Sequence, residues 1–277
     1  DIERTYNRMG NLVSVSDAAG VRTFNYDENF NLTEETFGDR TLAYTYSTSG
    51  IKGRYTGLIG NHTYSYDQYG RINQINDITY TRLTNSELIA QVNRPNGINS
   101  VYGYEANRDI ESGVSHGTFA SYGYTNNEIG NRTSMSRSGS VFSASDIINY
   151  SYNDRSEVTG ALSNAANTNY NYTFAFDLIG NRKEANLAGT SYTYTTNMLN
   201  QYTVVNSNQP TYDDDGNMLT NGGWTYTWNG ENRMIQAVNG NTKLQFVYDY
   251  MGRRIEKKVF DGDTVVSHNR FVYDDYK

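Results

Sequence analysis

Residues 113–117, with the sequence Gly-Val-Ser-His-Gly, match the G-x-S-x-G pattern of serine hydrolases and are the first candidate for chemistry. That pattern places a nucleophilic serine on a sharp turn between a strand and a helix, and a distant acid and histidine complete the site. The residues that follow, 118–122, have the composition of another strand. An ordinary glycine-bounded turn is therefore the favoured interpretation.

Three histidines, His62, His116 and His268, are the candidates for acid–base chemistry. A histidine beside tyrosine and arginine can abstract a proton next to a carboxylate that the arginine neutralises, which is how a lyase would act on an acidic polysaccharide. Nothing in the spacing of the three residues requires this reaction, and they are too dispersed for an obvious metal site. Solvated or packed histidines are the simpler interpretation, so we expect no catalytic residue.

Two short acidic segments, residues 213–217 (Asp-Asp-Asp-Gly-Asn) and 261–263 (Asp-Gly-Asp), bring several carboxylates close together. Carboxylate oxygens are ligands that Ca²⁺ prefers, but the distal glutamate of an EF-hand loop is missing here. The first segment also coincides with a predicted turn. We therefore predict plain turns at both places, with no metal and no cofactor.

These candidates lie on a repeated unit whose clearest copy is residues 246–255, Phe-Val-Tyr-Asp-Tyr-Met-Gly-Arg-Arg-Ile. Phe246 and Tyr248 are two residues apart, so they share one face of an extended strand. Asp249 and Gly252 are the residue types that a type I turn favours at its first and last positions. The unit therefore predicts a β-hairpin with a short turn closed by a glycine bulge.

Weaker copies of this unit recur along the whole chain. The leading tyrosines of the first four copies fall 20 residues apart, which is about the length of two strands and two turns. Phe30 replaces the turn glycine, which predicts a strained or differently shaped turn there. Residues 77–98 predict a divergent hairpin, and residues 134–145 predict a serine-rich loop. The positions to which we assign a structural role as repeat signature are Tyr26, Asp27, Tyr46, Gly50, Tyr66, Asp67, Gly70, Tyr104, Tyr124, Tyr152, Phe176, Asp177, Gly180, Tyr212, Asp213, Gly216, Trp228, Tyr248, Asp249, Gly252, Tyr273 and Asp274.

The pattern predicts an all-β fold, because no segment shows a sustained apolar period of 3.6 residues. Strands about 4.8 Å apart, roughly two dozen of them, would form a ribbon on the order of 110 Å wide. Strongly twisted open sheets rarely exceed about ten strands. We therefore expect antiparallel β-hairpins curled into a spiral β-sheet shell or tube. Residues 1–277 would form a single array of about a dozen repeats, a fragment of a longer chain.

Composition limits the function. The chain has 26 tyrosines, 36% hydrophobic residues, no cysteine and a formal charge of −7. Tyrosine can build a core if its hydroxyl finds a partner, and the phase of the tyrosines within the hairpins favours a core over a glycan-binding surface. An acidic balance argues against nucleic acid, whose phosphates require a basic face. No apolar run is long enough for a membrane span.

The units at Tyr248-Asp249, Tyr212-Asp213, Tyr66-Asp67 and Tyr26-Asp27 resemble the YD repeats of Rhs proteins, teneurins and the B and C components of insecticidal toxin complexes. The similarity covers essentially all of the chain. This resemblance implies a hairpin ribbon that spirals into a hollow shell, in large secreted or surface proteins. In several relatives the shell encloses a C-terminal toxin, which an aspartyl-protease-like site releases. The motif for that release and the toxin domain are not found here, so neither property is carried over.

We therefore expect a non-catalytic structural segment of a secreted or cell-surface bacterial protein, with a role in encapsulation, adhesion or extracellular assembly. The alternative is a protein that binds or cleaves polysaccharides through its tyrosine-rich surface. Unpaired strand edges recruit other chains, so the expected partners are the remaining parts of a longer chain or neighbouring copies. Glycans are a further candidate, whereas nucleic acid and a membrane span are not expected.

Overall fold

The computed structural model describes residues 2–46, 52–57, 60–164 and 171–273, and the regular elements in these ranges are β-strands. The chain divides into two units. Residues 1–64 together with 208–277 form the first unit, and residues 65–207 form the second. The interpretation of the chain as one continuous array stays a prediction. No helix long and apolar enough to span a bilayer is found among the residues described.

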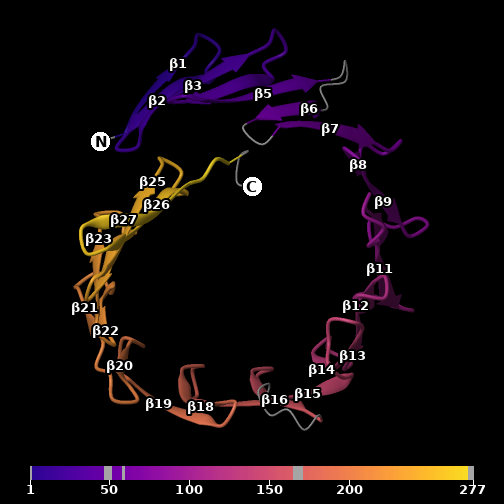
Figure 1. Cartoon of the computed structure of the whole chain (residues 1–277), viewed down its shortest axis with the longest axis vertical. Helices are drawn as coiled ribbons and strands as arrows, with labels where there is room; N and C mark the ends of the chain where they lie inside the picture. The colour runs from indigo at the N-terminus through magenta and orange to yellow at the C-terminus, as the bar shows by residue number, and fades with distance from the viewer. Residues whose placement is uncertain (1, 47–51, 58–59, 165–170, 274–277) are drawn as a thin grey trace. The chain divides into compact units, whose positions relative to one another are not determined.

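Within each unit, strands that follow one another in the chain pair as antiparallel neighbours, so the units are built from hairpins (Figure 1). The strands of the first unit are β1 (Glu3–Tyr6), β2 (Leu12–Asp17), β3 (Gly20–Tyr26), β4 (Leu32–Phe37), β5 (Arg40–Tyr46), β6 (Lys52–Gly57), β7 (Gly60–Tyr66), β21 (Thr211–Tyr212), β22 (Met218–Asn221), β23 (Trp224–Trp228), β24 (Met234–Asn239), β25 (Thr242–Tyr248), β26 (Arg254–Asp261) and β27 (Thr264–Arg270). The strands of the second unit are β8 (Ile72–Ile75), β9 (Ile78–Arg82), β10 (Ile89–Asn93), β11 (Ser100–Glu105), β12 (Arg108–His116), β13 (Ala120–Asn126), β14 (Arg132–Ser138), β15 (Asp146–Tyr152), β16 (Val158–Ser163), β17 (Tyr172–Phe176), β18 (Arg182–Leu187), β19 (Thr190–Thr196) and β20 (Tyr202–Val205).

The predicted turn is present at the clearest repeat copy. Gly252 N–H donates to Asp249 O over 2.8 Å, and Asp249 N–H donates to Arg253 O over 3.0 Å. Gly252 has a φ of 79°, a conformation that glycine adopts without steric cost. The strand register shifts between Val247 and Tyr248, as expected where a bulge closes a hairpin.

Of the two outcomes predicted at Phe30, a strained turn or a differently shaped one, the structure shows the strained turn. Its φ is 64°, and its N–H donates to Asp27 O over 3.1 Å, so it makes the same turn hydrogen bond as the glycine of other copies. The left-handed conformation costs a non-glycine residue roughly 1–2 kcal/mol. The turn therefore keeps its shape, and the side chain accepts the strain.

The carboxylate of the turn aspartate accepts the hydrogen bonds that hold the turn. Asp67 Oδ1 accepts hydrogen bonds from the N–H groups of Tyr69 and Arg71, at 2.9 and 3.0 Å, and Asp67 Oδ2 accepts one from Arg71 Nε at 2.7 Å. Asparagine provides the same Oδ1 contact to the residue four positions on at Asn7, Asn127, Asn153, Asn197 and Asn229. An Asx side chain, rather than aspartate alone, therefore defines the turn.

In several repeats the hydroxyl of the leading tyrosine donates a hydrogen bond to the preceding repeat. Tyr26 Oη donates to Leu12 O at 2.8 Å, and Tyr248 Oη donates to Met234 O at 2.9 Å. Trp228 Nε1 makes the equivalent hydrogen bond to Met218 O, also at 2.8 Å. These carbonyls belong to the second residue after the turn position of the preceding copy. The contact explains why tyrosine, and not phenylalanine, leads most of the repeats.

The aromatic rings of neighbouring repeats also pack together, as the 20-residue spacing predicts. Tyr44 and Leu42 are buried, and Leu32, Tyr46 and Tyr64 pack against them. Residues at alternating positions of β5 are exposed, namely Thr41 and Thr45, and on β3 Thr23 and Asn25 alternate in the same way with Arg22 and Phe24, which are buried. One face of these hairpins is therefore an aromatic wall, and the opposite face is polar.

Two irregular regions had different outcomes. The divergent hairpin is confirmed, because β9 and β10 pair antiparallel and the turn at residues 94–97 ends on Gly97 with a φ of 77°. The serine-rich loop is wrong for residues 134–138, which belong to β14 and pair with β13 and β15. Small hydroxyl residues fit the polar face of these strands, so serine content does not mark a loop here.

Replacing Tyr248 with phenylalanine should lower the free energy of unfolding of the first unit by about 1 kcal/mol, because the carbonyl of Met234 loses its partner. Urea denaturation of the wild type and the Tyr248→Phe variant measures this change. Tyr6→Phe is the matched control, because Tyr6 is 58% exposed. Equal effects of the two substitutions would show that the hydroxyl contact does not stabilise the array.

Candidate functional site

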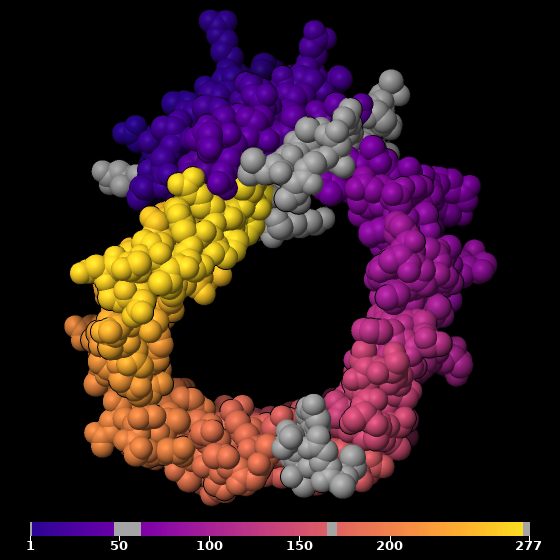
Figure 2. Space-filling model, viewed as in Figure 1, coloured from indigo at the N-terminus to yellow at the C-terminus, as the bar shows by residue number. Residues whose placement is uncertain are grey.

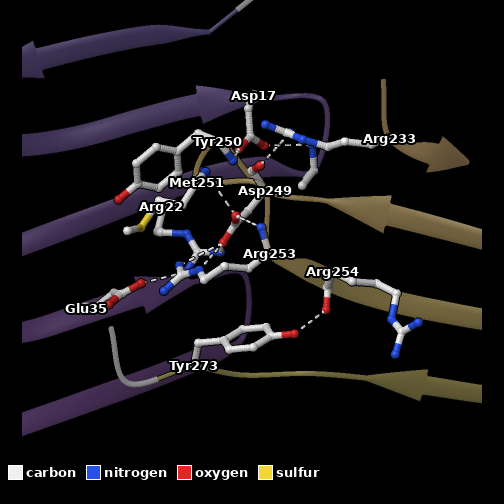
Figure 3. A network of polar contacts seen from close by, with 11 residues as sticks. Asp17, Arg22, Glu35, Arg233, Asp249, Tyr250, Met251, Arg253, Arg254 and Tyr273 are labelled. Carbon is white, nitrogen blue, oxygen red and sulfur yellow. Dashed lines mark hydrogen bonds and ion pairs between the residues drawn. The ribbon is translucent and has the colours of Figure 1, made fainter. Parts of the chain in front are cut away.

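The most buried charged residues of the first unit gather where the turn of the clearest repeat copy meets β3 and β4 (Figure 3). Asp249 is 2% exposed, and Arg22, Glu35 and Arg253 are 6%, 7% and 9% exposed. Arg22 and Asp249 are 227 residues apart in the chain. Buried charges are strongly unfavourable unless they are paired and hydrogen-bonded, so their arrangement decides whether these segments can pack together.

The four charged groups form one continuous chain of contacts, called here the Asp249 network. Asp249 Oδ2 accepts from Arg253 Nε at 2.8 Å and from Arg22 Nη2 at 3.3 Å. Arg22 Nη1 donates to Glu35 Oε1 at 2.6 Å. Two guanidinium groups and two carboxylates balance in charge, so the network can be buried without a net charge.

The neighbouring residue, Tyr250, adds a second connection between the same segments. Its N–H donates to Asp17 Oδ2 at 2.7 Å, and Asp17 is the last residue of β2. The guanidinium carbons of Arg4 and Arg22 lie 5.7 and 5.9 Å from the centroid of its ring. Burial raises the pKa of the Tyr250 hydroxyl, and the negative charge of Glu35 raises it further. The C-terminal hairpins thus lie against the N-terminal ones within the first unit (Figure 2).

One cleft borders the Asp249 network. Its volume is about 340 Å³, and it is lined by Glu35 and Arg253 of the network together with aromatic side chains that include Phe24, Tyr44 and Tyr250. A separate cleft of about 520 Å³ is lined by Phe37, Phe271 and other residues of β25, β26 and the N-terminal turns. The carboxylates of the network accept from guanidinium and backbone donors. The arrangement is therefore suited to holding two segments together, and not to transferring a proton.

The G-x-S-x-G segment lies in a hairpin of the second unit. Ser115 and His116 are the last residues of β12, and they pair with Ser121 and Ala120 of β13. Phe119 N–H donates to His116 O at 3.1 Å. A strand follows the motif instead of a helix, so no nucleophile elbow forms. The predicted turn is present only from Gly117 onward, because residues 113–116 belong to β12.

His116 belongs to a small polar cluster. Its Nδ1 lies 2.7 Å from Ser100 Oγ, and Arg94 Nη1 donates to the same oxygen, also at 2.7 Å. The Ser100 hydroxyl thus contacts both side chains, as an acceptor from Arg94 and as a hydrogen-bond partner of the His116 ring. Ser100 is fully buried, and a substrate could not reach its oxygen.

The other two histidines lie in the first unit. His62 is on β7 opposite Tyr55 of β6, whereas His268 is on β27 with its Nε2 3.1 Å from Glu256 Oε2. His116 is in the second unit. The predicted acid–base candidates thus lie on three separate strands, each with its own local contacts.

The acidic segments form turns. Asp213 Oδ1 and Oδ2 accept from the backbone and side chain of Asn217, at 2.7 and 3.0 Å. Asp261 is the last residue of β26, and Gly262, with a φ of 57°, and Asp263 form the turn to β27. Within the described ranges, no group of three or more histidine, aspartate or glutamate side chains is arranged to hold a metal ion.

Comparisons with known proteins identify the family. A family model described as Teneurin YD-shell matches residues 47–277, and a second model, described as RHS Repeat, matches residues 6–42. The chain belongs to the YD-shell family. The tyrosine–aspartate units that built the turns and hydroxyl contacts above are thus the units of this family.

Curated relatives cover only part of the chain. The chain is 33% identical over 107 residues to the tRNA3(Ser)-specific nuclease WapA of Bacillus spizizenii and to the tRNA nuclease WapA of Bacillus subtilis. Each match covers 33% of this chain and 5% of the relative. The chain therefore spans a small fraction of the length of these proteins.

Solved structures share the YD-shell fold. A crystal structure of TcdB2-TccC3-TEV has a TM-score of 0.76 at 14% identity, and the match covers 93% of this chain and 17% of that one. The structure of the Photorhabdus luminescens Tc holotoxin pore also has a TM-score of 0.76, at 16% identity, and the match covers 90% of this chain and 16% of that one. At this identity the similarity shows the fold, which is the predicted all-β shell of antiparallel hairpins.

In this YD-shell chain, most of the predicted signature aromatics close the first strand of a hairpin. Tyr104 and Tyr124 lie one and two residues before the ends of β11 and β13, and Tyr273 follows β27. Gly50 and Asp274 lie outside the described residues. The signature aromatics that are the last residues of their strands are Tyr26, Tyr46, Tyr66, Tyr152, Phe176, Tyr212, Trp228 and Tyr248. The signature residues in the turns that follow strands are Asp27, Asp67, Gly70, Asp177, Gly180, Asp213, Gly216, Asp249 and Gly252.

Sequence reasoning found Asp249 but missed the N-terminal residues around it. Arg22 contacts Asp249, Glu35 contacts Arg22, and Asp17 accepts from the neighbouring Tyr250 N–H. A signal for Arg22 exists. It precedes Phe24 by two residues, the position that Leu42 occupies in the next copy. A charged residue at a position of the aromatic wall indicates a buried ion pair, because an unpaired charge could not be accommodated there.

Replacing Asp249 with asparagine should lower the free energy of unfolding of the first unit by about 3 kcal/mol. The amide oxygen can keep the turn hydrogen bonds, but the two buried guanidinium groups of the network are left with the single carboxylate of Glu35. Breaking a buried ion pair costs about 3–5 kcal/mol. Urea denaturation with a probe in the first unit measures the difference.

Asp213→Asn is the matched control for this experiment. Asp213 makes the same turn contacts with Asn217, and no ion pair to it is found among the described residues. We expect a loss of at most about 1 kcal/mol, the value of an ordinary hydrogen bond. If the two variants were equally stable, the Asp249 network would contribute nothing beyond the turn.

The turn carboxylates should also make the protein sensitive to acid. Hydrogen bonds from the Asn31 side chain and backbone lower the pKa of Asp27 below its ordinary 3.8, and the equivalent asparagines lower the pKa values of Asp177 and Asp213. The folded-state pKa lies below the unfolded one, so this stabilisation is present above pH 3.8 and lost as the pH falls through the folded-state pKa. The urea concentration at the unfolding midpoint should therefore decrease when the pH is lowered below about 4. The triple Asp→Asn variant at Asp27, Asp177 and Asp213 should show a smaller decrease over the same pH range.

Proposed function

We propose that this chain is a non-catalytic, structural segment of a secreted or cell-surface YD-shell protein, and that the Asp249 network fastens its first unit. The single observation that supports this role is the set of four buried, mutually paired charges that joins β3 and β4 to a turn 227 residues away. Removing one partner of such a set is expensive, which favours one arrangement of the two segments over others.

The chemistry of the network favours fastening over catalysis. A general acid or base needs a group within reach of a substrate proton and a pKa matched to the reaction. Asp249 has a side chain without solvent exposure and accepts from two guanidinium groups. Its carboxylate is therefore committed to contacts within the protein.

The names of the WapA relatives describe a tRNA nuclease, and this activity does not suit the chain. Its formal charge is −7, whereas binding to tRNA requires cations that neutralise phosphates. We assign a scaffold role to the segment that this chain shares with them. Encapsulation, adhesion or extracellular assembly by a longer protein fits that role, with sheet edges as the contacts to the rest of the chain or to neighbouring copies.

Hydrogen exchange tests the fastening role directly. In the Asp249→Asn variant, amides of residues 20–37 and 246–255 should lose protection together, because one network holds both segments. The Asp213→Asn variant should leave residues 20–37 at their wild-type exchange rates. Loss of protection confined to residues 246–255 would show that Asp249 supports only its own turn.

The alternative role as a polysaccharide lyase is tested separately. The wild-type chain is incubated with a panel of acidic polysaccharides, and the ultraviolet absorbance of newly formed unsaturated sugars is followed. We expect no increase. Turnover that one His→Ala change at His62, His116 or His268 abolishes would replace the scaffold proposal with an enzymatic one.

A further inference from the structure

The turn that follows β23 carries an asparagine–glycine pair, Asn229-Gly230, where the clearest repeat copy has an aspartate. Asparagine is a thermolabile residue, because the main-chain nitrogen of the next residue can attack its side-chain carbonyl carbon and expel ammonia. A glycine in that next position has no Cβ to obstruct the attack. The chain holds four such pairs, which begin at Asn96, Asn221, Asn229 and Asn239.

The fold holds the side-chain oxygen of Asn229 between two donors. Asn229 Oδ1 accepts from the N–H groups of Glu231 and Arg233, both at 3.0 Å. Attack on the carbonyl carbon places negative charge on this oxygen. Backbone N–H groups aimed at a developing oxyanion stabilise the transition state, and removing one such donor costs an enzyme roughly 10²–10³ in rate. The turn therefore provides an oxyanion site for the amide of its own asparagine.

The attacking nitrogen is accessible to solvent. Gly230 is exposed, and no hydrogen bond from its N–H is found among the described residues. A Cβ built on Gly230 would meet no heavy atom within 4 Å beyond the chain neighbours, so the space beside it is open. The nucleophile and the oxyanion donors thus belong to one turn, which supplies the proximity that an intramolecular reaction needs.

The other three asparagine–glycine pairs lack one of these features. At Asn96 the nucleophile is engaged, because the N–H of Gly97 donates to Arg94 O at 3.0 Å. Asn221 Oδ1 is buried without a hydrogen-bond partner. No donor to Asn239 Oδ1 is found in the described part of the chain. The four pairs look alike in the sequence, and the turn is what distinguishes Asn229.

The clearest repeat copy shows what a carboxylate in this position does. Asp249 Oδ2 accepts from Arg253 Nε at 2.8 Å, in addition to the turn hydrogen bonds on Oδ1. Arg233 likewise lies four residues after Asn229, but its Nη1 contacts Glu231 Oε2 at 2.9 Å instead. Conversion of the Asn229 amide to an acid would offer Arg233 a charge-assisted hydrogen bond of the kind that Arg253 makes.

We propose that Asn229 is a self-modification site, at which the fold promotes deamidation to aspartate. The Gly230 nitrogen bonds to Asn229 Cγ, the Cγ–Nδ2 bond breaks, and ammonia leaves with the proton of the Gly230 N–H. Water from the solvent then adds to Cγ of the cyclic imide and breaks the new C–N bond, which restores the main chain and leaves a carboxylate. The modification adds one negative charge and is compatible with the scaffold role.

Peptide mass spectrometry of the whole chain, incubated at mildly alkaline pH, measures the conversion of amide to acid at each pair. In the folded protein we expect Asn229 to deamidate at least tenfold faster than Asn239. In urea, where the turns are lost, we expect similar rates, since both asparagines precede glycine. Equal rates in the folded protein, or a rate ratio that urea does not change, would overturn the proposal.

Two variants exchange the nucleophile in matched turns. Gly230→Ala should slow the reaction at least tenfold, and it should fold, because the φ of Gly230 lies outside the left-handed region and its surroundings are open. Asn197 Oδ1 accepts from the N–H groups of Leu199 and Gln201, at 2.9 and 3.0 Å, but a methionine follows it. Met198→Gly should therefore create a second fast site.

Thermal unfolding verifies that both variants are folded. If Asn197 kept its amide in the folded Met198→Gly protein at the pace of Asn239, two donors on Oδ1 would not promote the reaction, and the proposal would be wrong. An unchanged rate in Gly230→Ala would exclude attack by the main-chain nitrogen. None of these outcomes bears on the buried charges around Asp249, so the scaffold role is tested separately.

Discussion

The contact on which this structure depends is the hydrogen bond from the leading tyrosine of a repeat to a carbonyl of the preceding repeat. Few aliphatic side chains are buried, and those that are lie scattered along the strands. Packing of apolar side chains alone would not determine the position of one hairpin relative to the next. A hydroxyl at the end of a rigid ring does so, because the bond is directional and its carbonyl has a fixed place after the turn.

The Asp249 network shows how one copy of a repeat acquires a distinct role. Asp213 and Asp249 both hold their own turns through hydrogen bonds to the residue four positions on. Only Asp249 is also packed under Arg22, which comes from the other end of the chain. The carboxylate of Asp249 therefore has two functions. It holds the turn, and it pairs with Arg22, a residue that packs on the turn from another part of the first unit.

Local features were predictable from the sequence, because local residues determine them. The spacing of Tyr26 and Tyr46 gave the hairpin length, and Phe30 was identified as strained because its position needs a positive φ. A pattern defined by aspartate misses the turns that asparagine makes. Asparagine forms the same turn because its Oδ1 is an equivalent acceptor. The partner of Asp249 could not be predicted in this way. Docking of segments 227 residues apart leaves no periodic pattern, and only the charge of Arg22 within an aromatic series marked it.

The arginines of the array explain why a tyrosine-rich, arginine-containing surface need not bind a substrate. Arg182 lies 4.9 Å from the Phe174 ring centroid and 5.8 Å from that of Tyr194, so it is held between two copies. Arg132 stacks on Tyr124 at 3.5 Å. The Nε atoms of both arginines are buried without a hydrogen-bond partner, which leaves the aromatic faces as a main interaction for the guanidinium planes. A cation held in this way stabilises the wall of rings and is not available to an anionic ligand.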